Sequence, residues 1–128
     1  MSEPIVFISH NRVKEGMLAD FKKHYYGSIP PIEASKPDTL VQLAYVNEDD
    51  SEVDIVRLFP NAEGLDLQLQ GADQRSKVTY QFIEPTSIEI YGTPNNFAME
   101  MMKKVAGSGI KVSINPQYIG GFIRHKSG

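Results

Sequence analysis

The chain has 128 residues, the length of one ordinary domain, and we predict a single domain with a core over 1–92 and an extension over 93–128. A net charge of -3 argues against a nucleic-acid binder, which would carry a basic stripe, and the basic residues near the C-terminus are too few to form one. The absence of cysteine excludes disulfides, thiolate nucleophiles and cysteine-ligated metals. No stretch reaches the roughly 18 apolar residues that span a bilayer. We expect a soluble, cytoplasmic protein that binds neither nucleic acid nor membrane.

The first predicted strand covers about residues 5–10 and begins with Ile5-Val6-Phe7-Ile8, which is apolar on both faces. Strand side chains point alternately to opposite sides of a sheet, so a run without alternation needs cover on both sides. Residues 40–46 show the same pattern. Because the intervening chain supplies few helices, this pattern predicts a second copy of the protein against one face.

A first helix is predicted from about residue 15, because apolar residues recur three or four positions apart. Pro30 and Pro31 are expected to end or kink it, since proline lacks the backbone donor and clashes with the preceding turn. The apolar stripe consists of Leu18, Phe21, Tyr25, Ile29 and Ile32.

A hairpin and a second helical region follow. The strands 40–46 and 53–59 flank a five-residue polar turn, so they are predicted to pair antiparallel. Asn61 is a typical helix N-cap, and a helix from that residue is expected to end at Gly71. A further helical piece over 73–83 would turn Val78 and Phe82 inward. Alternation over 86–91 predicts a fourth strand.

The predicted order is strand, helix, strand, strand, helix, strand, which is the α+β ferredoxin-like βαββαβ arrangement with an antiparallel sheet. Its helices cover one face and leave the other open. In the extension we predict a helix from about Pro94, packed through its methionines, and a strand over 110–114. Residues 118–124 could form one more strand.

The chain resembles the dimeric α/β-barrel group that includes the antibiotic-biosynthesis monooxygenases. The resemblance covers about residues 5–91 and depends on the element order, the segment Phe7–Gly16 with its Val13-Lys14-Glu15-Gly16 linker, and Ile83-Glu84-Pro85 before the fourth strand. It implies a homodimer in which the open faces of two sheets form a barrel. It also implies members that oxidise aromatic or quinol compounds with oxygen and no cofactor. The haem-degrading branch is disfavoured because the chain has no tryptophan.

Two residues are candidates for catalysis. His10, at the predicted end of the first strand, is a candidate base if a cavity opens there under the helices. Arg57 interrupts an apolar strand, and a buried guanidinium needs a carboxylate or a ligand anion. Arg57 could therefore bind a substrate carboxylate or enolate. The alternatives are a structural histidine, and an ion pair between Arg57 and Asp54 or an acid of the hairpin.

Aromatic residues and one further histidine are the candidates for contacts with a planar ligand. Each has a structural alternative, as core packing or as a ring with its polar group in solvent. No spacing of histidine and acidic residues is typical of a metal site, so we predict no metal and no cofactor. The candidate ligand-binding residues are Phe21, His24, Tyr25, Tyr45, Tyr80 and Tyr91.

The sequence leaves two functions open. The first is a cofactor-independent monooxygenase acting on an aromatic or quinol-like small molecule. The second is a non-catalytic ligand-binding or stress-related dimer. The enzyme requires a cavity of roughly 300 Å³ or more with converging polar groups, so the presence of such a cavity separates the two.

Overall fold

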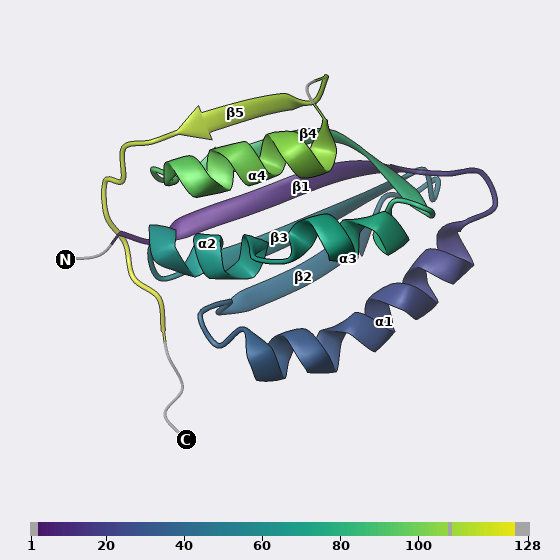
Figure 1. Cartoon of the computed structure of the whole chain (residues 1–128), viewed down its shortest axis with the longest axis horizontal. Coiled ribbons are helices and arrows are strands. Elements are labelled where there is room, and N and C mark those ends of the chain that lie inside the picture. The colour runs from purple at the N-terminus through teal and green to yellow at the C-terminus, as the bar shows by residue number, and fades with distance from the viewer. Residues whose placement is uncertain (1–2, 108, 125–128) are drawn as a thin grey trace.

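The computed structural model describes residues 3–107 and 109–124, and within them a five-stranded sheet carries four helices (Figure 1). Of the basic residues near the C-terminus, which are Arg124, His125 and Lys126, only Arg124 lies among these residues. The elements are β1 (Ile5–Val13), α1 (Leu18–Ser35), β2 (Val41–Val46), β3 (Glu52–Phe59), α2 (Ala62–Leu69), α3 (Ala72–Thr79), β4 (Ile83–Tyr91), α4 (Asn96–Ala106) and β5 (Lys111–Asn115).

The strand order across the sheet is β2-β3-β1-β4-β5. The first four strands pair antiparallel, which confirms the predicted ferredoxin-like core and the predicted hairpin. The fifth strand pairs parallel to β4, so the complete sheet is mixed. The reason is α4, which carries the chain back across the sheet and lets β5 run in the same direction as β4.

The helices lie on one side of the sheet, with α4, α2 and α3 in front of the strands in Figure 1 and α1 along the β2 side. This inner face of the sheet carries the buried apolar side chains of the core, together with polar side chains that are described with the cavity below. The opposite, open face has no cover within the described part of the chain. The core consists of two groups, one between the sheet and α2 and α4 around Phe59 and Met102, and one near α1 around Phe21 and Val53.

The first strand is longer than predicted, because β1 continues past His10 to Val13. A β-bulge lies opposite this extension: His10 pairs with Ser87, whereas Asn11 already pairs with Pro85. The extra residue, Thr86, donates a hydrogen bond from Oγ1 to the His10 carbonyl oxygen at 3.0 Å. The bulge therefore keeps β4 paired with the far end of β1, where the sequence predicted a turn.

The prolines do not end the first helix, since α1 continues through Pro30 and Pro31 to Ser35, and the kink stays a prediction. The prolines leave two backbone carbonyl groups of α1 without an amide donor. This part of α1 is largely exposed, so water can donate hydrogen bonds to those carbonyl groups. The Ser35 hydroxyl donates to the Pro31 carbonyl oxygen at 2.7 Å, and the Lys36 amide donates to the Ile32 carbonyl oxygen at 2.8 Å.

The start of α2 is as predicted, with the Gly64 amide donating to Asn61 Oδ1 at 2.9 Å. Gly71 separates α2 from α3 with a φ of 77°, a left-handed conformation that favours glycine. However, α3 ends at Thr79, and 83–85 belong to β4, where the bulge accommodates Pro85. Of the two residues predicted to turn inward, Phe82 packs against the core group around Phe21, whereas Val78 stays substantially exposed and outside the core.

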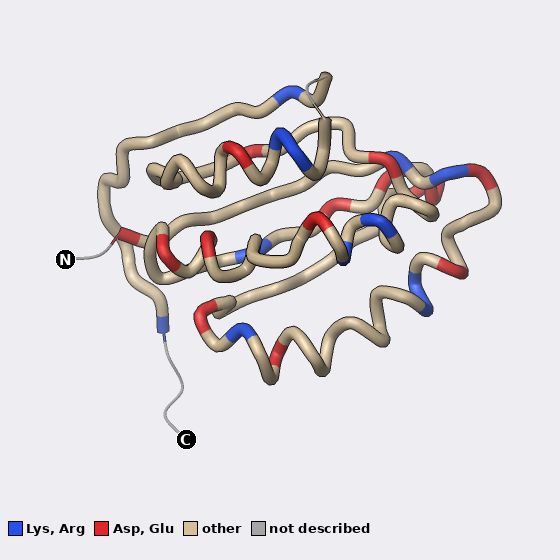
Figure 2. The backbone as a smooth tube through the Cα atoms, in the orientation of Figure 1, with Lys and Arg blue, Asp and Glu red and all other residues tan. Residues whose placement is uncertain are grey.

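Residues 118–124 form no strand, contrary to prediction. The sheet of the described residues ends at β5, so 118–124 pair with no strand in it, and Ile119 is fully exposed. Across the described residues, no helix combines the length and the apolar character needed to cross a membrane. Charged residues of both signs gather at the end of the sheet where β1 leads into α1 (Figure 2).

Candidate functional site

A cavity of about 440 Å³ lies between the inner face of the sheet and the helices. Its base is formed by β1, β3 and β4 with Gln42 of β2, and its walls are formed by the four helices. The volume exceeds the size that the enzyme hypothesis requires. The lining residues on which the chemistry depends are Ser9, Asn11, Phe21, His24, Tyr25, Gln42, Arg57, Gln68, Arg75, Thr79 and Tyr80.

Arg57 is the charged residue at the base of the cavity. It lies on β3 between Phe7 of β1 and Gln42 of β2, on the inner face. Its Nε donates to Gln42 Oε1 at 2.9 Å. Burial lowers the pKa of Arg57 to about 10, so the guanidinium stays charged at neutral pH. The alternative of an ion pair with Asp54 is wrong, because Asp54 lies on the open face, where its Oδ1 is 2.8 Å from His10 Nδ1.

Aromatic rings form one side of the cavity. Phe21 and Tyr25, one turn apart on α1, stack with ring centroids 5.9 Å apart. Tyr80 follows α3 and is mostly buried; burial raises its pKa, and the charge of Arg57 partly offsets that effect. A planar ligand between these groups would contact ring faces and the guanidinium together.

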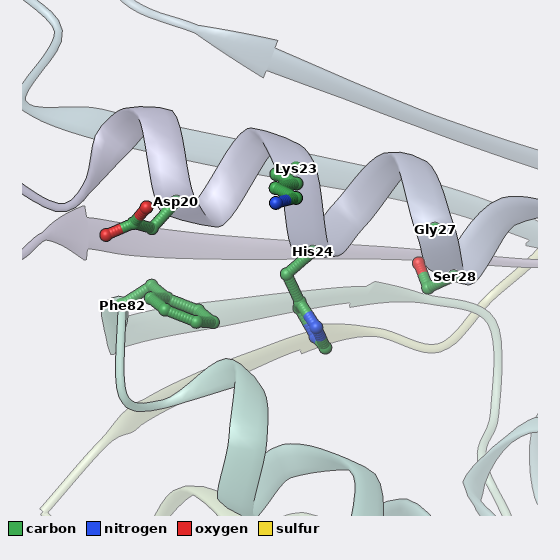
Figure 3. Close-up of a pocket in the computed structure, with 6 residues that line it drawn as sticks. All are labelled: Asp20, Lys23, His24, Gly27, Ser28 and Phe82. Carbon is green, nitrogen blue, oxygen red and sulfur yellow. The ribbon is translucent and has the colours of Figure 1, made fainter.

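His24 also lies at the cavity wall. Its Nε2 is 2.9 Å from Thr79 Oγ1, and its ring centroid is 5.5 Å from that of Phe82. The same residue lines a second, open hollow of about 600 Å³ beside α1, where its ring points toward the turn before β4 (Figure 3). His24 therefore separates the internal cavity from a solvent-facing depression.

Several polar groups of the cavity were not predicted. Asn11 is almost fully buried, and its Nδ2 donates to the Val53 carbonyl oxygen at 3.2 Å. Gln68 is also buried, and its Oε1 accepts a hydrogen bond from Thr39 Oγ1 at 2.5 Å. The sequence placed Asn11 in a turn. Extending the alternation Phe7, Ser9, Asn11 would have placed its side chain on the inner face.

His10 does not line the cavity, because its side chain lies on the opposite, open face of the sheet. Its Nδ1 is 2.8 Å from Asp54 Oδ1, and its Nε2 is 3.0 Å from Glu89 Oε2. Burial lowers the pKa of His10, but the hydrogen bonds and charges of Glu89 and Asp54 outweigh it, so the pKa is raised overall. Tyr45 and Tyr91 share this open face with His10.

The open face holds the one described group of side chains close enough together to share a cation: His10, Glu52 and Asp54, with ligand atoms within 4.8 Å of one another. The histidine already has carboxylate partners, since a protonated His10 donates to Asp54 and Glu89 from its two nitrogens. The expectation of no metal stays a prediction.

No family model matches the sequence, and no curated protein matches it. Solved structures do match. MupZ from Pseudomonas fluorescens gives a TM-score of 0.68 at 15% identity, over 94% of this chain and 91% of that chain. SnoaB, a cofactor-independent oxygenase from Streptomyces nogalater, gives 0.59 at 11% identity, over 74% and 97%. A candidate antibiotic biosynthesis monooxygenase from Bacteroides thetaiotaomicron gives 0.57 at 13%, over 69% and 85%.

The shared property is the fold. The chain has the monooxygenase-like ferredoxin fold of these structures, as the sequence resemblance implied. The MupZ match leaves about 8 of 128 residues out, so it includes most of the extension after Gly92. The extension, which lies outside the ferredoxin-like core, is therefore matched in at least one other protein.

Proposed function

We propose that the protein is a cofactor-independent monooxygenase acting on an aromatic or quinol-like small molecule in the inner cavity. The observation that carries the proposal is the cavity itself, which combines stacked aromatic rings, a charged guanidinium and buried amides in about 440 Å³. The fold shared with SnoaB, described as a cofactor-independent oxygenase, supports it.

The reaction requires a substrate that can lose a proton from carbon or from a phenolic hydroxyl group and whose anion can give electrons to oxygen. For a methylene group flanked by aromatic rings, one methylene and one dioxygen molecule give one ketone and one water molecule. A base removes one proton, the carbanion forms a C–O bond with oxygen, and the protonated hydroperoxide loses water as its second C–H bond and its O–O bond break. The protein contributes a base, a cation that stabilises the anion, and exclusion of water.

Arg57 is suited to stabilise the anion, because a fixed positive charge in a desolvated cavity favours developing negative charge. Of the two described histidines, His24 lines the cavity, and we assign the base to it in place of His10. Phe21 and Tyr25 would orient the ring system.

We also propose that the protein is a homodimer through the open face of the sheet. That face presents three large side chains that are substantially exposed: Leu43, Tyr45 and Tyr91. Exposed apolar side chains gathered on one face of a sheet are typical of an interface, and a two-fold dimer would place two such faces together.

The decisive experiment measures oxygen uptake and product mass with anthrone and 1,4-naphthalenediol under ¹⁸O-labelled dioxygen, against the rate without protein. We expect turnover by the wild type, incorporation of one labelled oxygen atom into the anthrone product, and a loss of roughly 100-fold or more in kcat for His24→Gln. If His10→Gln loses turnover and His24→Gln keeps it, the reaction takes place on the open face and the assignment of His24 as the base is wrong. No rate above background would refute the oxygenase and favour the non-catalytic binder.

A further inference from the structure

The charges around the inner cavity are of one sign. Two guanidinium groups, those of Arg57 and Arg75, line it, and no aspartate or glutamate among the described residues does so. Burial is the main cause of the lowered pKa of Arg57, and the positive charge of Arg75 lowers it further. A cavity with this wall favours an anion over a neutral or cationic ligand.

Arg57 has hydrogen-bond donors without a partner among the described residues. Its Nε is used by Gln42, but neither terminal nitrogen donates to an acceptor among the described residues. If these nitrogens were buried, they would be buried polar atoms without a hydrogen-bond partner. Among the described residues only Asp66 Oδ1 is such an atom, so both terminal nitrogens of Arg57 are accessible. The terminal N–H groups are therefore available to a ligand, and a guanidinium presents them in a geometry that matches the two oxygens of a carboxylate.

Arg75 contributes positive charge to the cavity, but its terminal nitrogens already donate to backbone carbonyl oxygens. Its Nη1 donates to the Gln70 carbonyl oxygen at 2.8 Å, and its Nη2 donates to the carbonyl oxygen of Gln68. These bonds fix the guanidinium at the end of α2, at the wall of the cavity. Its positive charge adds to the field that an anion would meet, while Arg57 supplies the free hydrogen-bond donors.

We propose that the natural ligand of this cavity is an aromatic carboxylic acid whose carboxylate binds the terminal nitrogens of Arg57. The cavity volume accommodates two or three fused rings, which would lie along Phe21 and Tyr25. The inference uses the same cavity as the proposed function and specifies its substrate class, but it does not depend on the oxygen chemistry.

The test is binding at pH 7 of 2-naphthoate and its neutral isostere 2-naphthamide, by isothermal titration calorimetry without oxygen. We expect the wild type to bind the acid at least roughly 10-fold more tightly than the amide. Arg57→Gln should lower the ratio to near 1 while leaving the affinity for the amide within about 2-fold, which also shows that the variant is folded. Arg57→Lys should keep part of the preference, because it retains the charge and loses the paired donors.

Equal affinity for acid and amide in the wild type, a preference that survives in Arg57→Gln, or no binding of either compound would each overturn the inference. The outcome is separable from the oxygenase proposal. A carboxylate preference without oxygen uptake would refute the oxygenase proposal and support the aromatic carboxylate as ligand. Turnover of neutral quinols without a carboxylate preference would support the oxygenase proposal and refute the carboxylate ligand.

Discussion

His10 and Arg57 lie on opposite faces of the same sheet. His10 of β1 pairs across the sheet with Asp54 of β3, and Arg57 follows Asp54 by three residues. An odd spacing along a strand reverses the side-chain direction, so Arg57 faces the helices and Asp54 faces the open side. The two candidate catalytic residues cannot act on one ligand in the cavity, and each has its own role.

The environment of His10 predicts a pH-dependent stability. Its ordinary pKa of 6.5 is raised in the folded protein by Glu89 and Asp54, against the opposing effect of burial. The stabilisation is complete below pH 6.5 and is lost as the pH rises through the raised value. Melting temperatures measured from about pH 6 to about pH 9 should therefore fall in the wild type.

The same melts on His10→Gln should show a flatter profile over that range, and Asp54→Asn should show an intermediate one. The pKa of Glu52 is also raised above its ordinary value of 4.5, by burial and by the neighbouring charge of Asp54. Parallel profiles for the wild type and His10→Gln would contradict the prediction.

Arg57 is predicted to cost stability in the unliganded protein. Burial lowers its pKa from 12.5 to about 10, and each unit corresponds to about 1.4 kcal/mol. Arg57→Met should raise the free energy of unfolding by roughly 1–3 kcal/mol. This range already allows for the loss of the hydrogen bond to Gln42, which offsets part of the gain. Urea denaturation at pH 7 measures it. A destabilised Arg57→Met would show that the guanidinium is satisfied within the protein.

The open face provides a test of the proposed dimer. Leu43 on β2 is 47% exposed on that face, and Leu67 on α2 is 43% exposed on the helical side. By light scattering at micromolar concentration, we expect a dimer for the wild type and for Leu67→Asp, and a monomer for Leu43→Asp, because an aspartate would be desolvated between the two sheets. A monomeric wild type, or a dimeric Leu43→Asp, would refute the interface.

Two glycines with positive φ should differ in their tolerance of alanine. At Gly92, with φ 115°, an added Cβ would lie 2.8 Å from Ile5 Cγ1 and 3.0 Å from the Pro4 carbonyl oxygen. At Gly16, with φ 74°, it would meet nothing within 4 Å. Gly16→Ala should cost about 1 kcal/mol from backbone strain alone. Gly92→Ala should cost at least about 2 kcal/mol more by urea denaturation; equal costs would contradict the close packing.

The fold was largely predictable because the strands carry local signals. Apolar runs, the polar hairpin turn and the Asn61 cap each indicate one element, and their order leaves few topologies. The site was less predictable. Asn11 lines the cavity only because β1 continues beyond His10, and that continuation depends on pairing with a distant strand. Arg75 reaches the cavity from a short, weakly amphipathic helix, whose packing the local sequence does not determine.

The bulge at Thr86 has a consequence for how this protein can change over time. Loss or gain of a residue within a strand ordinarily turns every following side chain to the wrong face. Here Ile83 and Pro85 share the inner face with Ile88 and Ile90 although their positions differ in parity, because the bulge absorbs one residue. A deletion at Thr86 would leave both faces of β4 as they are. The strand that borders the cavity thus contains one position at which its length can vary without exchanging its inner and outer side chains.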